Sequence, residues 1–149
     1  MSLNRKSKDE YYLNIVEAVL ERSACLRRKY GAVIVNDDEI ISTGYNGSPG
    51  GEVNCCDTGY CYRKHKRIPH GERYEACRSV HAEMNAIISA SRRDMINSTL
   101  YLAGIEADGS LVADIAPCPI CLRLILNAGI KAIVTSNNYG SIQRKEINP

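Results

Sequence analysis

Residues 99–135 are predicted to form a strand, a helix and a second strand, and this order constrains the fold more than any other feature of the sequence. TLYLA (99–103) and IKAIVT (130–135) are short apolar runs of strand length. Between them, residues 117–128 have the pattern of a helix ended by Gly129, a residue favoured just past a helix C-terminus. Such a unit normally places two parallel strands side by side through a right-handed crossover. The chain is therefore predicted to be an α/β protein.

The other predicted elements complete a layered fold. Apolar residues recur at helical spacing over 9–24, and alanines with two isoleucines suit a buried helix over 80–91. Further elements are expected as follows: strands at 32–35 and 40–43 forming a hairpin, a glycine-rich loop at 44–51, a turn at 107–110, and either an edge strand or a mobile tail at 142–149. The expected fold is α/β with three α/β/α layers and a mixed sheet, in which a hairpin precedes the parallel strands.

Length and composition are those of an ordinary soluble protein. The 149 residues are expected to form a single domain, 1–149, large enough to bury a core without disulfides. No apolar run reaches the roughly 20 residues of a membrane helix, and the charged start lacks the apolar stretch of a secretory signal. A cytoplasmic location is therefore expected, where clustered cysteines more often bind metal or act in catalysis than form disulfides.

The charge pattern is weakly informative. The net charge of +2 is too small to indicate nucleic-acid binding by itself. Basic residues cluster at 27–29 and 63–67, which fits either a solvated surface or a patch for phosphate groups.

Two short motifs carry the residue types of a catalytic zinc site. His81-Ala82-Glu83 opens one predicted helix, and PCPIC (117–121) opens another. One imidazole and two thiolates are good zinc ligands, and Cys118 and Cys121 face the same way on a first helical turn. The positive end of the helix dipole also favours thiolate over thiol. Three protein ligands leave a fourth position for water, as in catalytic zinc sites.

Glu83 supplies the proton chemistry that such a site needs. Two residues from His81, it can reach a metal-activated water without being a ligand, and it can pass a proton from that water to a leaving group. The pattern H-x-E…P-C-x-x-C is the signature of zinc nucleobase deaminases. Taken alone, a histidine at a helix start is more often a cap, and a lone CxxC is more often a redox pair or part of a structural zinc site. Their combination with the strand–helix–strand unit favours the catalytic site.

Several longer motifs together resemble one family. They are GAVIV (31–35), IISTGYNGSPGG (40–51), CCD (55–57), HAEMNAI (81–87), PCPIC (117–121) and NAGIKAIV (127–134). This combination closely resembles the zinc-dependent deoxycytidylate (dCMP) deaminases, including phage enzymes and the bacterial ComE operon protein 2 group. The resemblance runs from about residue 10 to 135. It implies a cytidine-deaminase-like fold and the conversion of dCMP to dUMP for thymidylate synthesis.

The resemblance also implies roles for individual residues and partners. Glu83 would protonate the ring nitrogen while zinc-activated water attacks C4, and Asn46 would contact the nucleotide. Tyr139 is expected to line the pocket, and Arg92 matches an arginine near the nucleotide in phage relatives. Many family members are hexamers regulated by dCTP and dTTP, so a homo-oligomer is expected. No membrane or nucleic-acid partner is expected.

The cysteines of VNCCDTGYC (53–61) are predicted to belong to a second, structural zinc site. In phage relatives a second zinc is held partly by cysteines at the positions of Cys25 and Cys55, whereas their carboxylate position is Ser79 here. The candidate ligands of this chain, not all of which are needed, are Cys25, Cys55, Cys61, His70 and Cys77. They lie in or near a poorly periodic insert, 52–78, that a metal could order. Cys25 could instead be a buried helix-end residue, and Cys56 is expected to be a bystander because neighbouring side chains in extended chain point apart.

Two departures from the family pattern and two rival functions stay open. The segment 104–116 before PCPIC is longer than in most relatives, and the chain ends soon after the last predicted strand. One rival is a zinc deaminase for another substrate, such as dCTP, cytosine or tRNA adenosine. The other is a catalytically silent zinc-binding protein. A simple thiol redox protein is disfavoured because the CxxC is accompanied by His81.

Overall fold

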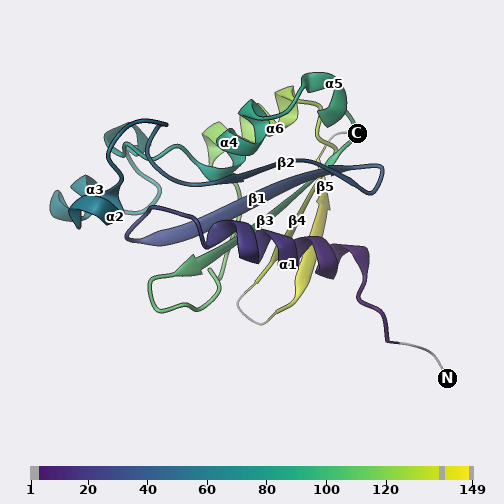
Figure 1. Cartoon of the computed structure of the whole chain (residues 1–149), viewed down its shortest axis with the longest axis horizontal. Helices are drawn as coiled ribbons and strands as arrows, with labels where there is room; N and C mark the ends of the chain where they lie inside the picture. Colours follow the sequence, from purple (N-terminus) through teal and green to yellow (C-terminus); the bar gives the residue numbers. More distant parts are fainter. Residues whose placement is uncertain (1–3, 138–139, 148–149) are drawn as a thin grey trace.

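The computed structural model describes residues 4–137 and 140–147 and contains a five-stranded sheet between two layers of helices (Figure 1). The strands are β1 (Arg28–Asn36), β2 (Glu39–Tyr45), β3 (Thr99–Glu106), β4 (Ala132–Ser136) and β5 (Ile142–Glu146). The helices are α1 (Lys8–Leu20), α2 (Cys55–Thr58), α3 (Tyr62–His65), the 3₁₀ turn η1 (Tyr74–Ala76), α4 (Ala82–Ile88), α5 (Arg92–Met95) and α6 (Pro119–Asn127). No described helix combines the length and the apolar character needed to cross a membrane.

The sheet has the order β2-β1-β3-β4-β5 and is mixed, as predicted. The β1–β2 hairpin is antiparallel, and β3 and β4 form the predicted parallel pair, with α6 between them in the chain. β1 and β3 join these two units as an antiparallel pair. β5 pairs antiparallel with β4, so the edge-strand alternative for the last segment is confirmed over 142–146.

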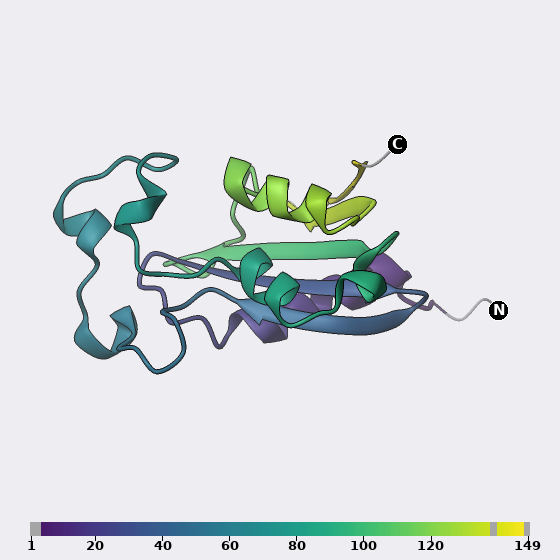
Figure 2. The same ribbon diagram turned by 90° about the horizontal axis from the view of Figure 1, so that it is seen from above.

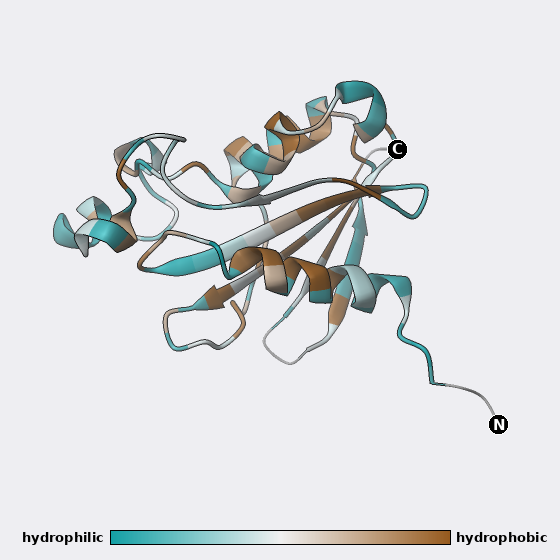
Figure 3. Cartoon of the chain, in the orientation of Figure 1, coloured by the Kyte–Doolittle hydropathy of each residue, from teal (hydrophilic) through white to brown (hydrophobic). Residues whose placement is uncertain are grey.

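The two faces of the sheet bury separate apolar clusters. On one face α1 covers a cluster made by Tyr12, Leu13, Val16, Leu20, Val33, Val35, Tyr101, Ala103 and Val134. On the other, α4, α5 and α6 cover a cluster made by Ala32, Ile34, Ala82, Ala86, Met95, Leu100, Leu102, Ile125, Ala128, Ile130 and Ile133. Figure 3 shows hydrophobic colouring on much of the inner strands and on parts of the helices, whereas β5 is hydrophilic. The predicted three-layer α/β/α arrangement is therefore confirmed.

Gly44 lets α4 lie unusually close to the sheet. A Cβ atom at Gly44 of β2 would lie 2.3 Å from the carbonyl oxygen of Ala82 and 2.4 Å from the backbone nitrogen of Ala86. Only a glycine fits so near a helix backbone. The small side chains of Ala82 and Ala86 are themselves fully buried. The start of α4 is thus fixed by backbone packing against β2.

Several predicted boundaries were wrong, each for a tertiary reason. The first helix ends at Leu20 rather than 24, because Ala24 leaves it to donate its N–H to the carbonyl oxygen of Asn46. The helix predicted over 80–91 covers only Ala82–Ile88, since Val80 forms a bridge with Gly47. β1, β2 and β3 are longer than predicted, and in β1 the polar residues 28–30 are added by pairing with 104–106 of β3. β4 covers Ala132–Ser136 rather than 130–135.

The segment 104–116 is less of a loop than expected. β3 continues to Glu106, the predicted turn at 107–110 is present, and Leu111 returns to bridge Ile105. Val112 is buried and donates its N–H to the carbonyl oxygen of Gly104. The part from 113 to 116 has no strand pairing, and it leads directly to PCPIC.

The insert 52–78 projects beyond one end of the sheet and contains only short helical turns (Figures 1 and 2). Cys55 and Cys56 start α2, so the expectation that they lie in extended chain was wrong. Arg63 is buried in this insert and donates to three carbonyl oxygens, those of Pro69, Glu72 and Arg73. One arginine side chain therefore organises a segment with few apolar residues.

Candidate metal and substrate site

The structure brings His81, Cys118 and Cys121 together at the starts of two helices. His81 is the N-cap of α4, and Cys118 is the N-cap of α6. The Nδ1 atom of His81 lies 3.6 Å from Sγ of Cys118 and 3.3 Å from Sγ of Cys121. Within the described residues, only this group brings three possible ligand atoms within 4.8 Å of one another.

The donor set and its surroundings fit zinc. Burial lowers the pKa of His81, with Arg63 adding to the effect, so the imidazole stays neutral as metal ligation requires. Burial raises the pKa of Cys121, and the nearby Glu83 and Cys118 raise it further. A dication at the centre of this group would offset the cost of burying thiolates. One imidazole and two thiolates are also ligands that zinc prefers.

Glu83 is a buried carboxyl beside this group. It lies in the first turn of α4, is 5% exposed, and belongs to none of the ion pairs seen over 4–137 and 140–147. Burial raises its pKa, with a hydrogen bond involving Cys121 acting in the opposite direction. A carboxyl whose pKa is raised in this way is suited both to accept a proton and to return it.

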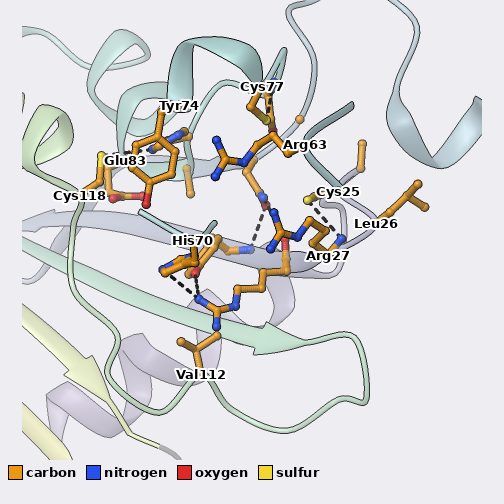
Figure 4. A pocket seen from close by; sticks show the side chains of 18 of the residues that line it. Cys25, Leu26, Arg27, Arg63, His70, Tyr74, Cys77, Glu83, Val112 and Cys118 are labelled. Carbon is orange, nitrogen blue, oxygen red and sulfur yellow. Dashed lines mark hydrogen bonds between the residues drawn. The ribbon is translucent and has the colours of Figure 1, made fainter. Parts of the chain in front are cut away.

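His81, Glu83 and Cys118 line one end of a cavity of about 320 Å³. Its other lining residues include Arg27, Arg28, Arg63, His70 and Tyr74. In Figure 4, Glu83 and Cys118 lie on one side of the cavity and Arg27 on the other. The ring of Tyr74 packs edge-on against His81, with centroids 5.3 Å apart, and the Arg63 guanidinium lies 5.1 Å from the Tyr74 ring centre. The insert thus supplies part of the cavity wall.

The three predicted substrate-binding residues differ in whether the structure places them at the cavity. Asn46 lines the cavity, but its Oδ1 accepts bonds from the Ser23 hydroxyl at 2.5 Å and the Tyr30 N–H at 2.9 Å. Its Nδ2 donates to the carbonyl oxygen of Arg28 at 3.0 Å, which leaves one N–H for a ligand. Arg92 is exposed at the start of α5 and is not among the lining residues. Tyr139 lies outside the described residues.

Four thiols gather on another side of the same cavity. Cys25, Cys55, Cys61 and Cys77 all line it, and all seven cysteines of the chain are free. Burial raises the pKa of Cys55, and Cys61, Cys25 and Cys77 are close enough to raise it further. His70 contacts Arg28 instead of these thiols, with its Nε2 atom 3.3 Å from Nη1 of Arg28. Cys56 is exposed and lies outside this thiol cluster, defined here as Cys25, Cys55, Cys61 and Cys77.

Several lining residues were missed as individual site residues, among them two arginines and a tyrosine. Arg27 and Arg63 belong to basic runs whose phosphate alternative was noted, yet nothing in the runs distinguishes them from their exposed neighbours. Tyr74 lies in the non-periodic insert and carries no motif. Only the folded insert shows that these residues line the same cavity as the metal group.

Comparisons with known proteins agree with the geometry. Residues 6–137 match the family described as the cytidine and deoxycytidylate deaminase zinc-binding region. The deoxycytidylate deaminase of Mycobacterium phage D29 is 36% identical over 137 residues, covering 89% of this chain and 96% of the phage protein. That of Schizosaccharomyces pombe is 33% identical over 135 residues, covering 91% of this chain but 38% of the yeast protein. This chain therefore spans under half of the yeast relative.

A solved structure shows the same fold. The dCMP deaminase of cyanophage S-TIM5 in apo form superposes with a TM-score of 0.63 at 27% identity, over 90% of this chain and 86% of the phage chain. The same phage enzyme in complex with dCMP and dUMP gives a TM-score of 0.60 at 26% identity, over 90% of this chain and 85% of that one. The chain belongs to the cytidine and deoxycytidylate deaminase family.

Proposed function

We propose that this chain catalyses the hydrolytic deamination of dCMP to dUMP, with zinc held by His81, Cys118 and Cys121. The observation that carries the proposal is the buried Glu83 carboxyl beside these three ligand atoms, in a cavity that also contains arginines. Relatives named as deoxycytidylate deaminases, and a similar phage enzyme crystallised with dCMP and dUMP, support this choice of substrate.

Glu83 is the proton carrier in the proposed reaction. A zinc ion bound at this site lowers the pKa of water toward 7 and so provides a nucleophile at neutral pH. Glu83 accepts a proton from the water and delivers it to ring nitrogen N3 as the water oxygen bonds to C4. It then transfers the remaining water proton to the amino group, the C4–N bond breaks, and ammonia leaves. No proton is gained or lost by the enzyme over the cycle.

The test is turnover by the zinc-loaded protein. We expect the cytosine absorbance of dCMP to fall as ammonia is released, faster than with dCTP, cytosine or tRNA adenosine. Glu83→Gln should lower kcat by about 10²–10⁴-fold and should keep its zinc, because Glu83 is not a ligand. Turnover of another of these substrates but not of dCMP would assign the alternative deaminase. Zinc binding without any turnover would favour the silent zinc protein.

We propose that the thiol cluster holds a second, structural zinc. Four cysteines are a complete structural ligand set, and the mutual effect of their thiols on the pKa of Cys55 supports their proximity. The contact of His70 with Arg28 argues against its inclusion. The metal would draw the thiols together and order an insert whose own apolar content is low.

Further features follow from the family and are part of the proposal. They are action as a single 1–149 unit in the cytoplasm, supply of dUMP for thymidylate synthesis, a homo-oligomeric state with the hexamer as the reference, and regulation by dCTP and dTTP. Light scattering and dCMP assays with added dCTP or dTTP test the assembly and the regulation.

A further inference from the structure

Tyr74 of the insert packs against the histidine of the metal group. The ring centres of Tyr74 and His81 are 5.3 Å apart and the ring planes meet at 84°, which is an edge-to-face contact. Tyr74 is half-buried and lines the cavity. In Figure 4 it lies on the same side of the cavity as Glu83 and Cys118. The insert therefore reaches the metal group through this aromatic side chain.

The hydrogen bonds of His81 leave the orientation of its ring open. His81 is the N-cap of α4, but its side chain makes no cap bond. Its Nδ1 atom lies near the two sulfur atoms, and none of the hydrogen bonds found over 4–137 and 140–147 involves its Nε2 atom. A metal-binding histidine is normally oriented by a hydrogen bond at its second ring nitrogen. A ring contact can fix the imidazole plane instead, and Tyr74 supplies one.

Arg63 holds Tyr74 in turn. Its guanidinium lies 5.1 Å from the Tyr74 ring centre, within the range of a cation–π contact. The Arg63 side chain is buried and donates to the carbonyl oxygens of Pro69, Glu72 and Arg73 at 2.9, 2.6 and 2.8 Å. The last two of these residues directly precede Tyr74. One guanidinium therefore fixes both the backbone that leads to Tyr74 and the ring itself.

We propose that Tyr74 is a positioning residue of the active site: its ring orients His81 for metal binding, and Arg63 holds that ring in place. The inference rests on the proposed function, because the orientation matters only if His81 is a zinc ligand. A working site needs its groups held to within about 0.5 Å, and an imidazole free to rotate about its side-chain bonds loses that precision. Order in the insert is thereby transmitted to a metal group whose three ligands all lie outside the insert.

The test removes the ring and the hydroxyl separately. Tyr74→Leu removes the aromatic ring, whereas Tyr74→Phe removes only the hydroxyl. With Co²⁺ in place of zinc, the visible spectrum reports the geometry and the affinity of the site, and the catalytic-site signal is the part that Cys118→Ser abolishes. We expect Tyr74→Leu to weaken metal binding at that site by about 10-fold and to lower kcat for dCMP by a similar factor, with little change in KM. Tyr74→Phe should recover most of both losses.

Tyr60→Leu is the matched control. Tyr60 is an exposed tyrosine of the same insert, its ring centre is 5.4 Å from that of His65, and neither residue lines the cavity. The cobalt spectrum and kcat should not change. Losses equal to those of Tyr74→Leu would show general damage to the insert and overturn the proposal. Equal losses in Tyr74→Phe and Tyr74→Leu would also overturn it, because the hydroxyl rather than the ring would then be responsible.

A double-mutant cycle tests the part played by Arg63. Arg63→Met keeps much of the side-chain length and removes the guanidinium. If Arg63 acts through Tyr74, this change should weaken cobalt binding in the wild-type background and have little further effect in Tyr74→Leu. Additive losses would overturn that step. Arg63→Lys, which keeps the positive charge beside the ring, takes its place in the cycle if Arg63→Met does not fold.

Cobalt binding needs no turnover, and this separates the inference from the proposed function. If Tyr74→Leu weakens binding at the catalytic site but the wild-type protein leaves dCMP unchanged, the proposed reaction fails and the positioning role stands. If the wild-type protein deaminates dCMP and Tyr74→Leu matches it in spectrum, metal affinity and kcat, the reaction stands and the positioning role is wrong.

Discussion

The two groups of sulfur ligands in this chain are held by different parts of the structure. Cys118 and Cys121 lie in the first turn of α6, which packs on the sheet core through Ile125, and His81 caps α4. The thiol cluster instead depends on the insert. Cys55 begins α2, Cys61 is the N-cap of α3, and Cys77 follows η1, all elements of four residues or fewer.

The comparison shows what fixes the positions of the ligand atoms at each site. The ligands of the first group are brought within 4.8 Å by regular structure that is stable through its own packing. The thiols of the second group are near one another, but no three of them among the described residues reach that spacing. We therefore expect a bound metal to fix the thiol positions in the second site, whereas packing of the core fixes the ligand positions in the first. Each prediction below tests one side of that contrast.

The largest effect is expected from Cys118→Ser. Serine can keep the cap bond that Sγ of Cys118 accepts from the N–H of Cys121, but it is a poor zinc ligand. Turnover should fall about 10³-fold or more, since metal supplies several kcal/mol of transition-state stabilisation. Because the packing is unchanged, unfolding by urea should shift little. Normal zinc content with normal dCMP turnover would remove Cys118 from the site.

The first group could be predicted from sequence because helix starts carry recognisable signals. Cap positions, prolines and the three-residue spacing of Cys118 and Cys121 place the ligands, and the strand–helix–strand pattern brings α6 to the sheet. The parallel pair of β3 and β4 follows from the same pattern. Local rules therefore determine most of this region.

The arginine-lined end of the cavity could not be predicted to the same degree. Arg27 and Arg63 are separated by 36 positions and meet only because the non-periodic insert folds back over the start of β1. The hydrogen bonds of the Asn46 side chain to Ser23, Tyr30 and Arg28 could not be predicted either, because they join residues far apart in the sequence. Helix and strand ends were misplaced for the same reason, because contacts such as Ala24 with Asn46 and Val80 with Gly47 compete with local propensity.

Gly44→Ala should produce the next largest effect, now on stability. Its Cβ would overlap the backbone of Ala82 and Ala86, and neither can move without shifting the start of α4. We expect a loss of about 3 kcal/mol in the free energy of unfolding, together with lower activity. Urea unfolding monitored by circular dichroism measures it.

Gly59→Ala is the matched substitution in the insert. Nothing lies within 4 Å of its Cβ position, and the only cost is its φ of 68°. About 1–2 kcal/mol is expected for an alanine in this left-handed conformation. If Gly44→Ala cost no more than Gly59→Ala, then α4 would not be fixed by close packing, and the contrast between the two regions would fail.

Cys55→Ser should affect the insert more than the reaction. Loss of one thiol should lower the zinc content of the folded protein and reduce the free energy of unfolding by about 2 kcal/mol. The insert should also become more open to trypsin at the exposed basic residues Lys64, Lys66 and Arg67. Digestion followed by mass spectrometry locates the cuts. Unchanged zinc content and unchanged digestion would contradict a metal site in the thiol cluster.

The smallest effect is expected from Cys56→Ser, which differs from the previous change by one position. Cys56 is exposed, its Sγ is 3.9 Å from Oδ1 of Asp57, and its contact with the body of the protein is the backbone bond from its N–H to the carbonyl oxygen of Ala24. Serine keeps that backbone bond. Zinc content, trypsin sensitivity and dCMP turnover should therefore match the wild-type protein, and the free energy of unfolding should change by no more than about 0.5 kcal/mol. A loss of zinc equal to that of Cys55→Ser would instead place Cys56 among the ligands. The insert would then have to rearrange around α2, and the thiol cluster would be defined by metal rather than by the fold seen here.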